Sequence, residues 1–109
     1  MKKEKKIIID TDIGDDIDDA YAIALAVRMR AFDILGVTTV YRNSWQRAKI
    51  ASALLGLLGR EDVGVYAGED YPRRECFRVE EFEEKLPDGR AVIPHYSPAF
   101  AAAPVREGN

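Results

Sequence analysis

The stretch "KKIIIDTDIGDDIDDAYAIALAV" (residues 5–27) joins a short apolar run to a dense group of acidic residues. Three consecutive isoleucines lead into Asp10, and six of the ten residues from Asp10 to Asp19 are aspartates. A β-branched run that stops abruptly at charge predicts a buried strand over 6–10. We call residues 10–19 the aspartate loop. Carboxylates this close repel one another, so the loop is costly to fold unless a cation lies among them.

The rest of the pattern predicts strands and helices in alternation. Helical spacing of apolar residues covers 18–31, and both faces of that helix are apolar, which predicts burial on more than one side. A second strand is expected over 36–40, together with Ile34 and Leu35, and a third over 63–67. Between them, Ser44 is the expected N-cap of a helix over 45–58. This alternation predicts an α/β fold, with a partial Rossmann-like parallel sheet in the order β-α-β-α-β.

The chain divides by composition at about residue 70. Residues 1–70 form the predicted β-α-β-α-β core, and residues 71–109 form an irregular, proline-containing tail of the same domain. One short helix is expected near 79–85. No element is predicted over 90–109.

The composition is that of a soluble globular protein, with 47% hydrophobic and 32% charged residues. A formal net charge of -3 gives no electrostatic reason to expect a nucleic acid partner. The longest apolar stretch is well short of a membrane span, and the isoleucine run is too short for a signal peptide. The single cysteine, Cys76, cannot form an internal disulfide. We therefore expect a cytoplasmic protein without membrane association.

The aspartate loop lies where α/β proteins bind ligands, at the carboxyl ends of parallel strands. Asp10 and Asp12 are two residues apart and would project to the same side. Gly14 permits a tight turn, and a helix dipole favours acidic residues in the first turn of the helix that follows. Six aspartates nevertheless exceed what a helix cap requires. We therefore predict a hard divalent cation with oxygen ligands, Ca²⁺ or Mg²⁺.

This part of the chain resembles the inosine-uridine preferring nucleoside hydrolase family, also called nucleoside N-ribohydrolases. The amino-terminal motif of that family runs strand–D-x-D-x-G-x-D-D-A–helix, and "IIIDTDIGDDIDDAYAIALA" is similar to it. The resemblance continues through "ILGVTTVYRNS", where the family has a second strand ending in asparagine, and through "VGVYAGED". It covers residues 5–70.

One departure from the family motif is visible. The family form places one residue between Gly and Asp-Asp, whereas three residues separate Gly14 from Asp18 here. Alignment on "DDA" makes Asp18 and Asp19 the equivalents of the family pair. Asp15 and Asp16 are then extra residues.

The resemblance implies Ca²⁺-dependent hydrolysis of the N-glycosidic bond of ribonucleosides, with a role for five residues. Asp12 and Asp19 would be metal ligands, and Asp12 would also take a proton from a metal-bound water. Asp18 would hold a ribose hydroxyl, and Asn43 would contact the ribose. Asp10 would support the loop from outside the ligand set. A turn-forming role is the alternative for Asn43.

Later segments of the family carry further ligands, ribose-binding residues and a histidine for the leaving base, and they have no counterpart in this sequence. The one histidine, His95, lies in "VIPHYSPAF" without the glycines expected around it, so we interpret it as a loop histidine. We expect a truncated nucleoside hydrolase-like chain that is inactive or incomplete by itself. Open sheet edges and uncovered apolar helix faces predict a homo-oligomer.

Two other interpretations stay open. Phosphohydrolases of the haloacid dehalogenase type also place D-x-D after the first hydrophobic strand, with the first Asp as nucleophile and Mg²⁺ as clamp. "DTDIG" fits that motif, but Gly14 stands where a small hydroxyl or branched residue is usual. The third interpretation is a non-catalytic metal- or ribose-binding remnant.

Overall fold

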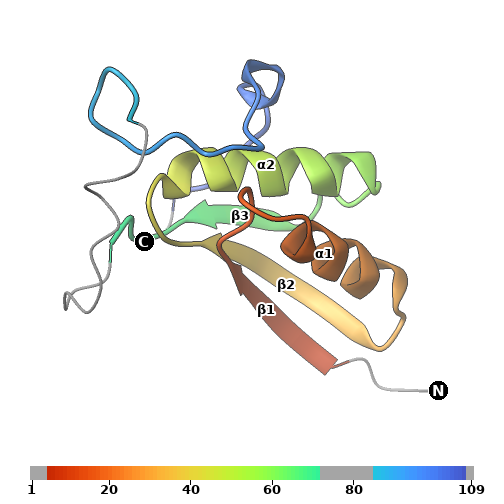
Figure 1. Ribbon diagram of the computed structural model, residues 1–109. Helices are drawn as coiled ribbons and strands as arrows, with labels where there is room; N and C mark the ends of the chain where they lie inside the picture. The colour runs from red at the N-terminus through yellow and green to blue at the C-terminus, as the bar shows by residue number, and fades with distance from the viewer. Residues whose placement is uncertain (1–4, 72–84, 108–109) are drawn as a thin grey trace.

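The computed structural model describes residues 5–71 and 85–107, which form a small α/β unit (Figure 1). Its three strands are parallel and hydrogen-bonded in the order β1-β2-β3, which confirms the predicted fold class. The elements are β1 (Lys5–Thr11), α1 (Asp18–Arg28), β2 (Phe32–Thr39), α2 (Ser44–Leu57), β3 (Gly64–Ala67) and a short 3₁₀ helix, η1 (Pro98–Phe100).

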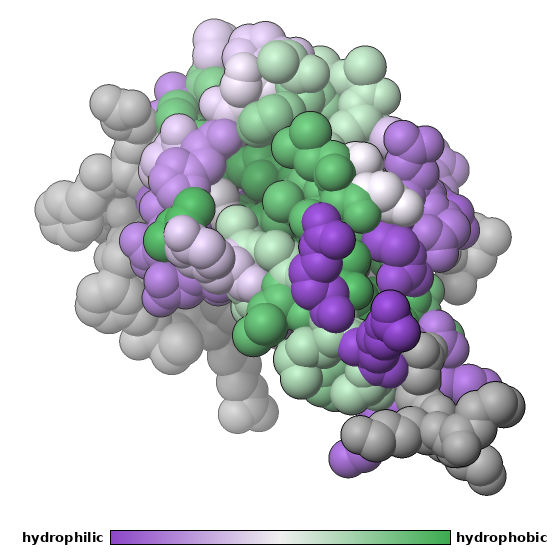
Figure 2. Space-filling model, turned by 90° about the vertical axis from the view of Figure 1, so that its right-hand side faces the viewer, coloured by the Kyte–Doolittle hydropathy of each residue, from purple (hydrophilic) through white to green (hydrophobic). Residues whose placement is uncertain are grey.

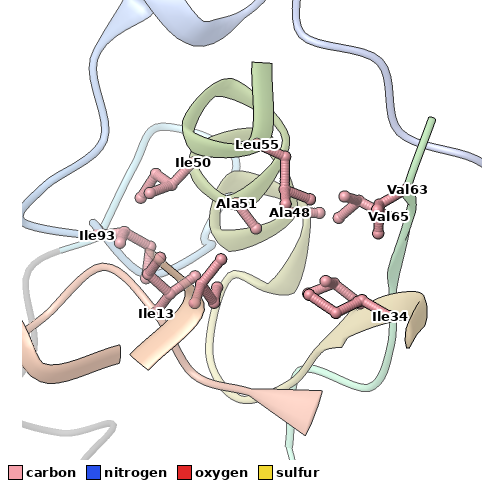
Figure 3. Close-up of a cluster of buried hydrophobic side chains, with 11 residues drawn as sticks. Ile13, Ile34, Ala48, Ile50, Ala51, Leu55, Val63, Val65 and Ile93 are labelled. Atoms are coloured by element: carbon pink, nitrogen blue, oxygen red, sulfur yellow. The ribbon is translucent and has the colours of Figure 1, made fainter. Parts of the chain in front are cut away.

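Both long helices lie on the same face of the sheet (Figure 1). Two successive right-handed crossovers that step in one direction place their helices on one side. The core lies between this face and the helices, with α2 above its centre (Figure 3). Ile34 and Val65 face it from the sheet, and Leu55 faces it from α2. Each such side chain contributes about 1.5–3 kcal/mol through its burial.

The predicted end of the first helix and the predicted start of the second strand were wrong. The first helix ends at Arg28 rather than at residue 31, because the backbone is already extended at Met29, with φ −80° and ψ 126°. The second strand accordingly begins at Phe32, and a bulge opposite Ile7 and Ile8 absorbs one extra residue.

The predicted N-cap of α2 was also wrong by one residue. Asn43 is the cap, and its side-chain oxygen accepts a hydrogen bond from the Gln46 N–H at 3.2 Å. Ser44 is instead the first helical residue, and its hydroxyl lies 2.7 Å from both an Asp70 carboxylate oxygen and the Gly68 carbonyl, so that its one proton is shared between these acceptors. A contact with a distant segment therefore decides between two neighbouring cap residues.

The expected burial of α1 on more than one side was wrong. Ile23 is its one fully buried residue, whereas Tyr21 is 70% exposed and Leu25 is 62% exposed. The face of the sheet opposite the helices is open as well, with Ile8 of β1 66% exposed. Figure 2 shows a broad apolar area at the centre of one face of the molecule. Within residues 5–71 and 85–107, neither long helix could cross a membrane.

The described part of the tail packs against the core. The Arg106 N–H donates to the Val65 carbonyl at 2.7 Å, which places the end of the tail beside β3. On α2, the Lys49 ammonium donates to the carbonyls of Ala101 and Ala103 at 2.9 and 2.7 Å. The 3₁₀ helix η1 is an element that the sequence did not predict. The helix expected near 79–85, except for its last residue, and Cys76 lie outside the described residues.

Candidate functional site

The aspartate loop connects the carboxyl end of β1 to the start of α1, as the sequence indicated. Its first residue, Asp10, lies on the sheet, where its Oδ1 accepts a hydrogen bond from the Thr38 hydroxyl of β2 at 2.8 Å. Asp10 is therefore linked to the neighbouring strand. This arrangement is compatible with the supporting role that the family resemblance implies, which stays a prediction.

Asp12 and Asp19 come together across the loop. The Thr11 hydroxyl donates to Asp19 Oδ2 at 2.5 Å, and the Thr11 oxygen also accepts from the Ile13 N–H at 3.1 Å. Thr11 thereby fixes the Asp19 carboxylate next to the turn that carries Asp12.

The pKa values of Asp12 and Asp19 are shifted in opposite directions. Partial burial raises the pKa of Asp12, and the neighbouring Asp19 raises it further through a hydrogen bond and through repulsion. The pKa of Asp19 is lowered, first because the Thr11 hydroxyl stabilises its ionised form. Two carboxyl groups in contact favour a proton or a cation between them. The loop therefore holds one acidic pair that a cation would stabilise.

Asp15 faces away from this pair, toward two arginines. Its Oδ2 accepts from Arg47 Nη2 at 3.2 Å and from Arg42 Nη1 at 3.3 Å. One of the two extra residues of the loop is therefore the partner of two basic side chains. Asp16 and Asp18 are exposed, and Asp18 begins α1. The exposed position of Asp18 leaves its carboxylate accessible to a ligand.

Asn43 is buried, with 1% of its surface exposed. Besides capping α2, its side-chain nitrogen donates to the Ala91 carbonyl at 3.2 Å. The structure thus shows the turn-forming alternative, in which the amide is used inside the chain. A contact with ribose would require these bonds to be exchanged, and it stays a prediction.

Two residues beside the site have an unusual backbone. Tyr41 and Arg42 have φ angles of +80° and +64°, in the left-handed region that residues other than glycine rarely adopt. Such conformations cost about 1–3 kcal/mol each and concentrate at functional sites. The turn that they form joins β2 to Asn43.

Arg47 is a site residue that sequence reasoning missed. Its side chain is completely buried and donates to the carbonyls of Asp12, Ile13 and Tyr41 as well as to Asp15. A signal was present in the sequence, because Arg47 lies in the same helical stripe as the apolar residues that face the core. An arginine in such a stripe needs buried acceptors.

His95 also contributes to the loop, through its backbone. Its N–H donates to the Gly14 carbonyl at 2.8 Å. Its side chain lines an apolar groove of about 340 Å³ with residues of both helices, Ala20 and Leu57 among them. This placement beside the turn was not predicted.

The donors fit a hard cation in kind. Carboxylate oxygens are the ligands that Ca²⁺ and Mg²⁺ prefer, and Ca²⁺ takes about 6–8 of them. In the described parts of the chain, no group of three or more acidic, histidine or cysteine side chains is arranged to hold a metal. Asp12 and Asp19 would therefore supply part of a coordination shell.

The chain matches the sequence profile of the family described as "Inosine-uridine preferring nucleoside hydrolase" over residues 7–96, and it belongs to that family. This confirms the resemblance drawn from the aspartate loop. Uridine nucleosidase 1 of Arabidopsis thaliana is 42% identical over 74 residues, which are 66% of this chain and 21% of that protein. An uncharacterised protein of Corynebacterium ammoniagenes, encoded 3' of ribF, is 48% identical over 65 residues, which are 58% of this chain and 68% of that protein.

Among solved structures, the plant nucleoside hydrolase PpNRh1 is similar with a TM-score of 0.55 and 36% sequence identity. The match covers 67% of this chain and 25% of that enzyme. The chain thus spans about a fifth of the length of the plant nucleosidase and a quarter of the solved enzyme.

Proposed function

We propose that this chain supplies the first part of a Ca²⁺-dependent site that hydrolyses the N-glycosidic bond of ribonucleosides. The observation that carries the proposal is the hydrogen bond from Thr11 to Asp19, which holds the Asp19 carboxylate beside Asp12 at the carboxyl edge of a parallel sheet, in a chain of the nucleoside hydrolase family. These two carboxylates would hold the cation. Mg²⁺ is the alternative ion, because it prefers the same oxygen ligands.

The proposed chemistry uses the loop carboxylates in separate roles. A bound Ca²⁺ would supply charge to activate water and to orient the ribose diol. Asp12 would accept a proton from the attacking water. Asp18 would accept a hydrogen bond from a ribose hydroxyl. The negative charge of the loop would stabilise the oxocarbenium-like state through which the bond breaks.

We expect little turnover of uridine or inosine by this chain alone. Asp12 and Asp19 provide few of the ligands that Ca²⁺ needs, and much of the rate of an enzyme comes from accurate positioning. Chromatographic assay of base release tests this expectation. Release of base well above the rate in buffer would contradict it.

Membership of the family decides against the phosphohydrolase interpretation. The non-catalytic remnant is the remaining alternative, and ligand binding distinguishes it. We would titrate the ¹⁵N-labelled chain with uridine in Ca²⁺ and again after chelation. Asp18→Asn and Asp16→Asn make a matched pair, since each removes one exposed charge from the same loop.

The proposal predicts that uridine shifts the amide signals of the loop only when Ca²⁺ is present. Asp18→Asn should weaken this response, and Asp16→Asn should leave it unchanged. If uridine causes no shifts in the presence of bound Ca²⁺, the chain is a remnant that binds metal without binding nucleoside.

A further inference from the structure

The guanidinium of Arg47 lies underneath the aspartate loop, and each of its three nitrogens donates a hydrogen bond. Nε donates to the Tyr41 carbonyl at 2.7 Å. Nη1 donates to the carbonyls of Asp12 and Ile13 at 2.7 and 3.0 Å, and Nη2 donates to Asp15 Oδ2 at 3.2 Å. A single side chain of α2 therefore holds the loop and the end of β2 together.

Burial of this charge needs an explanation beyond packing. Arg47 has no exposed surface, and its neighbours in the same stripe of α2 are the small apolar residues Ala48 and Ala51. A buried guanidinium is costly unless acceptors surround it, and an apolar residue at such a position is often at least as stabilising. The fork shape of the group suits several acceptors in a fixed arrangement. The contacts of Arg47 match that property.

The bonds made by Arg47 determine which way the loop faces. The carbonyls of Asp12 and Ile13 both turn inward, toward Arg47. The next carbonyl, that of Gly14, accepts from the His95 N–H at 2.8 Å. With three successive carbonyls held by distant segments, the backbone of the turn is fixed where Asp12 lies beside Asp19.

We propose that Arg47 is a positioning residue that holds Asp12 beside Asp19 before any cation binds, with Asp15 as its counter-ion. This inference rests on the proposed function, because it assigns the orientation of the proposed metal-binding pair to a residue that does not touch the ion. It also gives Asp15 a defined task. Asp15, which is extra to the family motif, neutralises the guanidinium of Arg47 that orders the loop.

Terbium luminescence separates positioning from plain stabilisation. Tb³⁺ replaces Ca²⁺ at oxygen sites, and its emission lifetime reports how many waters remain bound to it. We would compare Arg47→Met and Arg47→Lys with Lys49→Met as the matched control. Lys49 lies on the same helix and also donates two bonds to backbone carbonyls, but those carbonyls, at Ala101 and Ala103, belong to the tail.

Arg47→Met should weaken Tb³⁺ binding by about 10–100-fold, as is usual for residues that orient metal ligands. Its lifetime should shorten, because water replaces a carboxylate that has turned away. Arg47→Lys retains the charge without the fork, so it should fold and show a smaller loss of affinity. Lys49→Met should lower the urea midpoint of unfolding without changing affinity or lifetime.

Each failure has its own pattern. If the unsubstituted chain binds no Tb³⁺, the proposed function fails, and this inference fails with it. If the unsubstituted chain binds and both Arg47 variants bind with the same affinity and lifetime, only the positioning role is overturned. If Arg47→Met does not fold, Arg47→Lys decides by the same two measurements.

Discussion

Gly14 is the residue of the aspartate loop whose substitution has the most calculable effect. Its φ is +126°, a conformation that side chains with a Cβ rarely adopt. A Cβ at this position would lie 2.5 Å from Ile93 Cγ2 and 2.9 Å from Ile50 Cδ1. Both isoleucines belong to the buried core, where they lie close to Ile13 (Figure 3). They cannot move away without disturbing their own packing.

Gly14→Ala should therefore destabilise the chain through two separate effects. The backbone conformation costs about 1–3 kcal/mol for a residue with a Cβ. Overpacking against the two isoleucines costs about 1–3 kcal/mol more. The sum, about 2–6 kcal/mol, is a large part of the roughly 5–15 kcal/mol that stabilises a typical domain of this size.

Gly59→Ala is the matched control for this substitution. Gly59 also has a positive φ, +76°, but no heavy atom lies within 4 Å of where its Cβ would be. It should cost only about 1–2 kcal/mol, from the backbone alone. Urea unfolding followed by far-ultraviolet circular dichroism measures both variants. If the two lose equal stability, the loop does not pack against Ile50 and Ile93, and the reasoning is refuted.

Three further predictions concern the acidic pair, the cap of α2 and the exposed apolar surface. The pKa of Asp12 is raised in the folded chain, so without metal the folded state loses stability as the pH rises through that pKa. Asp12→Asn should therefore raise the urea midpoint of unfolding slightly at pH 7 but not at pH 3. An unchanged midpoint at pH 7 would argue against repulsion between Asp12 and Asp19. Asn43→Ala removes a helix cap and a buried hydrogen bond, so it should cost about 2 kcal/mol, whereas Ser97→Ala, at the cap of the short η1, should cost less than about 1 kcal/mol. The chain should self-associate at micromolar concentration in sedimentation velocity, and Leu57→Lys, at an 85% exposed position, should reduce this; a monodisperse unsubstituted monomer would exclude it.

Local patterns predicted the order of the elements correctly. The isoleucine run, the helical spacing after Asp18 and the glycines near the later strands each depend on neighbouring residues, so they are visible in sequence. The ends of elements depend on distant contacts. Serine and asparagine are equally suitable N-caps, so the sequence does not choose between Asn43 and Ser44. The contacts of Ser44 with Gly68 and Asp70 place it in the first turn of α2.

The candidate site was predicted in part for the same reason. A parallel sheet places the aspartate loop at its ligand-binding edge, and the resemblance of the loop to the family motif singled out Asp12 and Asp19 within it. The place of Arg47 in the apolar stripe of α2 was a signal for burial, but its contacts could not be predicted, since the carbonyls of Asp12 and Ile13 lie about thirty-five residues earlier in the chain. The task of Asp15 depends on Arg47, so it was hidden as well. Such contacts form because a crossover connection brings distant segments together, so no short sequence motif contains both partners.

The most direct test of the metal site is a calorimetric titration of the metal-stripped chain with Ca²⁺, alongside Asp12→Asn and Asp16→Asn. The two variants remove the same charge from the same loop, but only Asp12 lies beside Asp19. We predict measurable Ca²⁺ binding by the unsubstituted chain and by Asp16→Asn, and its loss in Asp12→Asn. Absence of binding heat in the unsubstituted chain, or equal binding by the two variants, would contradict a cation site built on Asp12 and Asp19.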